Sequence, residues 1–129
     1  MSNLPPRLLA SFAFAGALFG QNFKPDDVKV LGDLKYGQTS TSVECATSYC
    51  AFVFDGNGED RIEANVKGVD GTTFVAIADG SLTQLSSSTN RVVLSLPNHG
   101  PDAEAFYIVF CNDQHKPTRF VVALKKLPR

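Results

Sequence analysis

Apolar and polar residues alternate along most of this chain with the two-residue period of β-strands. The clearest case is the run from Phe52 to Val66, in which two strand-like segments flank the turn Asp55–Asp60. Ile62, Ala64 and Val66 alternate there with polar residues, as in a strand that has one face in the core and one in solvent. Because Asp-Gly and Asn-Gly pairs are typical of tight turns, the run predicts a hairpin.

Similar segments, separated by turn residues, recur about every ten residues, and no helical periodicity competes with them after residue 30. They predict strands at Val28–Leu31, Thr39–Cys45, Tyr49–Asp55, Asp60–Lys67, Thr73–Asp79, Arg91–Leu96, Ala105–Asn112 and Thr118–Lys126, with a short one near Leu82–Leu85. This spacing favours an all-β fold, an antiparallel β-sandwich of jelly-roll or Greek-key type with about eight strands.

Strand parity then predicts which side chains meet in the core, because alternate residues of a strand share one face. The predicted core is Phe52, Phe54, Ile62, Val66, Val75, Ile77, Val92 or Val93, Leu94, Leu96, Phe106, Ile108, Phe110, Phe120, Val122 and Leu124.

The first twenty residues differ from the rest of the chain. Arg7 is their only charged residue, and Leu8–Phe19 is apolar or small, too short to span a bilayer but of the length of a signal-peptide core. We therefore expect residues 1–20 to be a signal peptide, cleaved after Ala17 or Gly20, and residues 21–129 to form one periplasmic or secreted domain without a stable membrane anchor. The alternative is a buried apolar helix at the N-terminus.

Composition narrows the functions that this domain can have. A chain of 129 residues with 43% hydrophobic residues can bury one ordinary core. Its net charge of −1 and pI near 6.1 lack the basic excess that neutralises phosphates, so nucleic acid is not an expected partner.

The three cysteines lack the paired spacing of a zinc site. Cys45 and Cys50 flank four residues, so across a hairpin they can face each other at a distance that a disulfide spans. Cys111 has the parity of the outward-facing residues of its strand, whereas Cys50 shares the parity of Phe52. We therefore predict a disulfide between Cys45 and Cys50 that leaves Cys111 out.

Several motifs together resemble the bacterial pre-peptidase C-terminal domain family, in the same order along the chain. They are Leu34–Thr39 with its Tyr-Gly-x-Thr, Tyr49–Phe54, the Gly-Asp-Arg-like turn Gly58–Glu63, Val75–Asp79 and Ala105–Val109. The resemblance implies a jelly-roll sandwich that accompanies exported enzymes and aids secretion, folding or substrate binding. It implies no catalytic residues.

Candidate chemistry is sparse. His99, Asp102 and Glu104 share a polar loop where acid–base or metal chemistry is conceivable, although a solvated loop is the favoured interpretation, as it is for His115. Asp55–Asp60 has oxygen ligands at alternate positions, but it lacks the glycine and glutamate positions of an EF-hand. A turn is therefore favoured, with a weak calcium site left open, and we expect no cofactor and no metal.

Two hypotheses for function follow. The first is a non-catalytic, exported accessory module that presents loops such as 98–104 to another exported protein. Carbohydrate is a less favoured partner, because the chain has no Trp and only three Tyr to form stacking platforms. The second is a small secreted enzyme that uses His99, Asp102 and Glu104.

Overall fold

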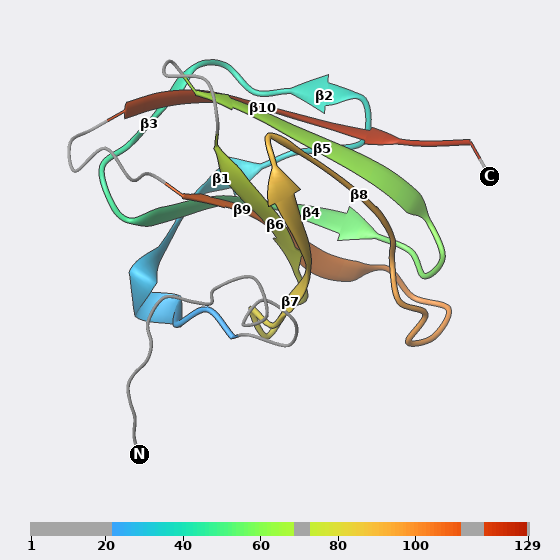
Figure 1. Ribbon diagram of the computed structural model, residues 1–129. Coiled ribbons are helices and arrows are strands. Elements are labelled where there is room, and N and C mark those ends of the chain that lie inside the picture. Colours follow the sequence, from blue (N-terminus) through green and yellow to red (C-terminus); the bar gives the residue numbers. More distant parts are fainter. Residues whose placement is uncertain (1–21, 69–72, 112–117, 129) are drawn as a thin grey trace.

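Two β-sheets packed face to face make up the protein. The computed structural model describes residues 22–68, 73–111 and 118–128 (Figure 1). The first sheet has the order β1 (Val28–Asp33), β4 (Tyr49–Gly56), β9 (Glu104–Cys111), β6 (Phe74–Ala78), β7 (Gln84–Thr89). The second has the order β2 (Gln38–Thr39), β10 (Thr118–Lys126), β5 (Arg61–Gly68), β8 (Arg91–Ser95), and β3 (Val43–Cys45) also pairs with β10. A short 3-10 helix, η2 (Pro25–Asp27), precedes β1. The predicted β-sandwich is confirmed, with ten strands in the described chain rather than about eight.

The bounds and directions of the strands differ from the prediction in three respects. The segment predicted at Thr39–Cys45 divides into β2 and β3, which pair with different parts of β10. The short strand expected near Leu82–Leu85 is the longer β7, which includes the serine run and forms an edge of its sheet. The sandwich is also not wholly antiparallel, because β1 runs parallel to β4.

The predicted hairpin at Asp55–Asp60 is wrong. β4 pairs with β1 and β9, whereas β5 pairs with β10 and β8, so the two strands belong to different sheets. The turn therefore carries the chain from one layer of the sandwich to the other.

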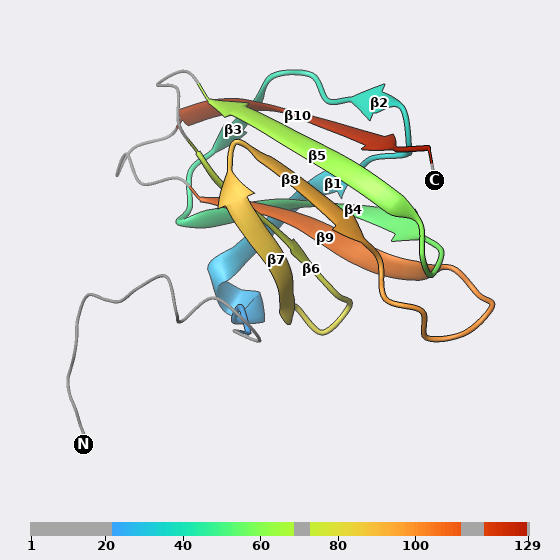
Figure 2. The same ribbon diagram turned by 45° about the vertical axis from the view of Figure 1, so that its right-hand side comes forward.

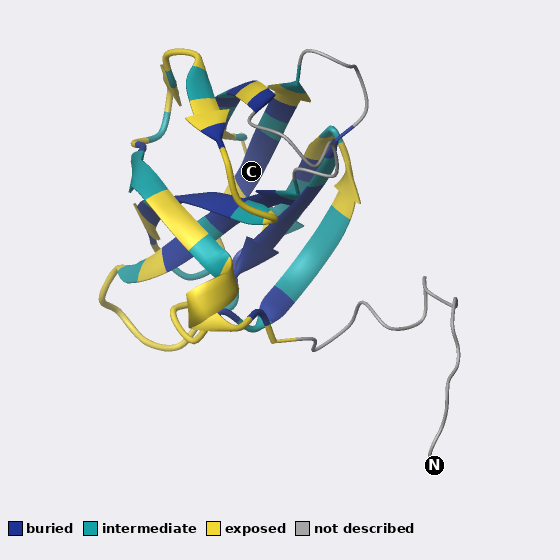
Figure 3. Cartoon of the chain, turned by 90° about the vertical axis from the view of Figure 1, so that its left-hand side faces the viewer, coloured by how far each residue is buried: buried dark blue, intermediate teal, exposed yellow. Residues whose placement is uncertain are grey.

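The core between the sheets follows the parity of the strands. All the predicted core residues are buried there, except that Val92 rather than Val93 points inward and Leu94 is half-buried. Phe110 joins the layers, with ring centroids 6.4 Å from Phe52 in its own sheet and 5.0 Å from Phe120 in the other. Figure 3 shows the buried strands at the centre and the exposed turns around them.

A second, smaller cluster covers the outer face of the first sheet, and strand parity did not predict it. Ala51, Ala76 and Val109 point away from the main core, yet each is fully buried. Phe23 packs against this cluster, donates its backbone N–H to Leu82 O at 2.8 Å and lies edge-on to Tyr49 at 5.3 Å. The segment from Asn22 through η2 to β1 thus runs outside the sheet between its two edge strands (Figure 1).

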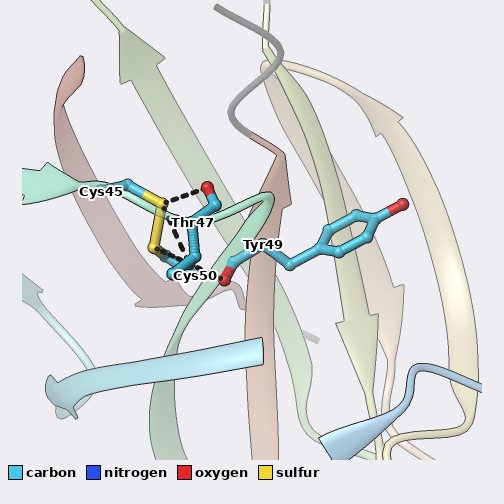
Figure 4. Close-up of a disulfide and its surroundings, with 4 residues drawn as sticks. All are labelled: Cys45, Thr47, Tyr49 and Cys50. Carbon is cyan, nitrogen blue, oxygen red and sulfur yellow. Dashed lines mark hydrogen bonds between the residues drawn. A yellow bond between two sulfur atoms is a disulfide. The ribbon is translucent and has the colours of Figure 1, made fainter. Parts of the chain in front are cut away.

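A disulfide between Cys45 and Cys50 fastens the two layers together (Figure 4). Cys45 ends β3 in the second sheet and Cys50 lies in β4 of the first, with Cα atoms 6.1 Å apart. The pairing is as predicted, but the bond joins two sheets rather than facing residues of one hairpin. Cys111, half-exposed, lies outside it, and Cys50 faces the core as expected.

Removing this disulfide should cost modest stability, because the closed loop is short. Chain-entropy reasoning gives about 2 kcal/mol for a loop of this length. We expect the C45S/C50S variant to lose about that much free energy of unfolding by chemical denaturation. Peptide mapping without reductant should show the Cys45–Cys50 crosslink, and a crosslink to Cys111 would contradict the arrangement.

Candidate functional site

Two connections meet at one end of the sandwich and form an exposed surface, which we call the loop end: residues 57–59 between β4 and β5, and residues 97–103 between β8 and β9. Figure 2 shows the second loop projecting beside the first. Backbone hydrogen bonds join their bases, from Glu59 N to Leu96 O at 2.9 Å and from Leu96 N to Asp60 O at 2.8 Å. Residues 98–103 are all exposed.

Asp60 fixes the base of the loop end. It is only 2% exposed, and its carboxylate accepts hydrogen bonds from the Tyr36 hydroxyl at 2.8 Å and from Asn57 N–H at 3.0 Å, while Lys126 Nζ lies 3.4 Å away. Burial opposes ionisation, but these donors and the lysine charge together lower the pKa of Asp60. Burial, and then the hydrogen bond to Asp60, raises the pKa of Tyr36. The pair is therefore a neutral phenol donating to a carboxylate.

Close packing explains the glycines of this turn. A Cβ on Gly58 would lie 2.7 Å from Asn98 Cα, and a Cβ on Gly56 would lie 2.9 Å from the Tyr36 hydroxyl and still closer to Leu96. The residue with positive φ in the turn is Glu59, at 70°. The glycines thus let the two connections touch, rather than supplying the left-handed conformation that a tight hairpin needs.

The loop 97–103 is also held by its own side chains. Asn98 donates from Nδ2 to Glu59 Oε2 at 3.1 Å and accepts the Gly100 N–H at Oδ1 at 3.1 Å. His99 Nδ1 lies 3.1 Å from Glu104 Oε2. These contacts order a loop that is otherwise in solvent.

The structure brings together two of the three residues proposed for acid–base chemistry. His99 and Glu104 form a pair, but their side chains are 54% and 36% exposed, and Asp102 is likewise exposed in the loop. An acid–base site needs a positioned third group and a place for substrate. This pair has neither among the described residues, and His115 lies outside them.

The proposed calcium turn has its carboxylates apart. Asp60 points inward to Tyr36, whereas Asp55 is exposed. Within residues 22–68, 73–111 and 118–128, no three His, Cys, Asp or Glu side chains are grouped to hold a metal ion.

Two hollows on the described surface are small. One of about 190 Å³ lies beside Tyr36 and is lined by Leu34, Val53 and Phe54 with charged residues at its rim. Another of about 260 Å³ lies over Ala123, between Thr39 and Asn65. Both are smaller than the roughly 300 Å³ at which pockets for small ligands begin.

A second polar cluster lies on the outer face of the second sheet. Glu63 accepts hydrogen bonds from Arg91 Nε at 2.9 Å and Asn65 Nδ2 at 2.8 Å, and Lys125 Nζ lies 4.0 Å away. Those two hydrogen bonds and the nearby positive charges lower the pKa of Glu63 to about 2.

Sequence reasoning found the His99 loop but missed Tyr36 and Asp60 as partners. They are 24 residues apart, and no local pattern joins them. The available signal was the resemblance, since its motifs contain Tyr36 in one turn and Asp60 in another.

Comparisons with known proteins show the fold. No family model and no curated protein matches the sequence. The structure is similar to Aeromonas hydrophila PliG, a periplasmic lysozyme inhibitor of g-type lysozyme, with a TM-score of 0.53 and 8% identity over 78% of this chain and 99% of that one. It is also similar to the pre-peptidase C-terminal domain of collagenase from Bacillus anthracis, with a TM-score of 0.48 and 12% identity over 81% and 100%.

Identities this low show a shared fold alone. The domain in the second comparison is of the kind that the sequence resembles. Among the described residues, no helix is long and apolar enough to cross a membrane.

The Glu63 cluster makes the free energy of unfolding depend on pH in the acidic range. The folded state lowers the pKa of the Glu63 carboxyl from an ordinary 4.5 to about 2. The ionised carboxylate therefore makes its full contribution to the free energy of unfolding above about pH 4.5, and this contribution is lost as the pH falls toward 2. We expect Glu63→Gln to lower the denaturation midpoint at neutral pH and to flatten its fall between those values. The stability of this variant should still fall somewhat on acidification, because the pKa of Asp60 is also lowered in the folded protein.

Glu44→Gln is the matched control, since Glu44 is exposed on the same face, opposite Arg119. An identical acid profile for the Glu63→Gln variant and the unaltered protein would contradict the assignment.

Proposed function

We propose that this chain is an exported, non-catalytic β-sandwich that binds another protein through its loop end. The observation that carries the proposal is an exposed loop with an ordered base. Residues 98–103 face solvent, while Asn98, Leu96 and Asp60 tie the loop to the neighbouring turn.

Such a loop is suited to recognition. Ordering a flexible segment on binding costs free energy, so a loop already held in one conformation binds more tightly for the same contacts. Binding residues are also concentrated on loops that a rigid scaffold positions. Here the scaffold consists of the two sheets, their aromatic core and the disulfide.

Other features favour a protein over other ligands. The small hollows suit a small molecule poorly, and Tyr36 lies half-buried against Asp60, where it offers no platform for a sugar. PliG, which shares the fold, is by its description an inhibitor of an enzyme. It illustrates that a sandwich of this shape can act by binding a protein.

Export is part of the same proposal. Disulfides form and persist mainly in oxidising compartments, and Cys45–Cys50 is one. The apolar stretch at residues 8–19 supplies the route as a signal peptide, with the domain released to the periplasm or the medium.

A photo-crosslinking amino acid placed at Asp102 tests the proposal, with the same substitution at Lys29 on the edge strand β1 as the matched control. Exported protein carrying the probe at Asp102 should give one discrete adduct that mass spectrometry identifies as a protein. The control should not give it. Asn98→Ala, added to the Asp102 probe, should reduce the yield because it loosens the loop.

Equal adducts from both positions, or none from Asp102, would contradict binding at the loop end. Turnover that disappears on His99→Ala without any loss of folding would instead support the enzyme hypothesis.

A further inference from the structure

The outer face of the second sheet carries a concentration of positive charge that the whole-chain charge hides. Alternation along β5, β8 and β10 places five basic residues on this face, all exposed, and we call them the basic face: Arg61, Lys67, Arg91, Arg119 and Lys125. Among the described residues, two carboxylates share the face, Glu44 opposite Arg119 and Glu63 beneath Arg91. The face therefore has a net charge of +3, and the remainder of a chain whose total is −1 has −4.

The basic side chains form an extended array rather than a point site. Outward-facing residues of one strand repeat about every 6.7 Å, so the rows from Arg119 to Arg61 extend over roughly 27 Å across neighbouring strands. This length suits a surface or an extended segment, and it exceeds what one small anion could contact.

Two of the guanidinium groups are held in place. Arg91 lies on Glu63, and Arg119 donates from Nε to Ser42 Oγ and from Nη2 to Ser42 O, both at 3.0 Å. A guanidinium in fixed orientation can still offer its remaining N–H groups to a carboxylate, with little ordering cost. Arg91 and Arg119 are therefore already oriented to bind carboxylates.

Between the charges lies an apolar floor. Val93, Val121 and Ala123 are half-buried on the same face, and the hollow of about 260 Å³ lies over Ala123. Protein interfaces combine such apolar patches with a polar, charged rim.

We propose that the basic face binds an acidic surface of another protein. The face lacks the large apolar side chains that insert into a membrane, and its carboxylates, Glu44 and Glu63, offset two of the five basic charges and would repel an anionic lipid surface. Nucleic acid, with one charge about every 1.7 Å, would require more basic residues than these. The proposal does not depend on the loop end, which lies in the connections before β5 and after β8 and carries the acidic residues Glu59 and Asp102.

The small area of the face limits the contact that it can make with a partner. A patch roughly 27 Å by 14 Å is about half of what one partner contributes to a standard interface, so the complex should be weak and transient. Its attraction should also be screened by salt, since the Debye length shortens from about 30 Å at 10 mM to about 8 Å at 150 mM.

Fluorescence anisotropy with a labelled polyglutamate peptide tests the proposal on the full exported chain. We expect binding at about 10 mM salt that weakens about tenfold at 150 mM. The R61E/K67E variant should lose binding by a similar factor. K24E/K29E is the matched control, because it changes the net charge equally at exposed positions away from this face and should bind nearly normally.

The melting temperature of each variant separates unfolding from loss of binding. Absence of salt-dependent binding, or equal loss in both variants, would overturn the proposal. Tighter binding to phosphatidylglycerol vesicles or to heparin than to the peptide would overturn its choice of partner. Self-association by light scattering that R61E/K67E abolishes would also overturn it, because the face would then bind the acidic remainder of a second copy.

Discussion

The buried carboxylate of Asp60 is the interaction on which the end of this molecule depends. A charged group in a protein interior is tolerated only where donors and opposite charges compensate for its lost hydration. Asp60 has three such partners, and they come from three parts of the chain: Tyr36 before β2, Asn57 in the turn after β4, and Lys126 at the end of β10. One carboxylate thereby determines how the connection between the two sheets is folded and where the loop above it lies.

The rest of the sandwich provides a stiff support for that end. Phe110 packs on Phe52 in its own sheet and on Phe120 in the other, and Cys45–Cys50 joins the sheets covalently at another place. Phe23 covers the outer face of the first sheet, so both sides of its central strands are buried. Two exposed surfaces of the described chain differ in charge: the loop end carries Glu59 and Asp102, and the outer face of the second sheet is basic. A small domain of this kind is suited to making contacts on two sides.

The alternation of apolar and polar residues predicted the core well. The face that a residue such as Ile62, Val66 or Phe106 occupies is set by its position in its own strand alone. The same reasoning failed where a third element intervenes. Val109 has outward parity but is buried under Phe23, and local parity contains no information about that cover. The Asp-Gly and Asn-Gly pairs of the turn Asp55–Asp60 predict a hairpin because they are local signals, whereas the partner of a strand is a property of the whole sheet.

The candidate site was predictable in part for the same reason. His99 and Glu104 are five residues apart in one loop and do pair, but the contact between Tyr36 and Asp60 spans 24 residues and two turns. The Cys45–Cys50 pair was predicted correctly from short spacing, although its geometry, between sheets, was not. Contacts between residues close in the sequence could be predicted, and the contact between two distant turns could not.

Native-state hydrogen exchange of the amides at the base of the loop end tests most directly whether Asp60 holds it. Asn57, Glu59 and Leu96 donate to Asp60 Oδ2, Leu96 O and Asp60 O, so these three should be protected in the native chain. Asp60→Asn should speed their exchange by about tenfold or more, since a hydrogen bond to a buried charge contributes about 1.5–3 kcal/mol. Ile108 in the core should be unaffected, as should all of these amides in the control Asp55→Asn. Unprotected amides in the native chain, or equal exchange rates in both variants, would contradict the account.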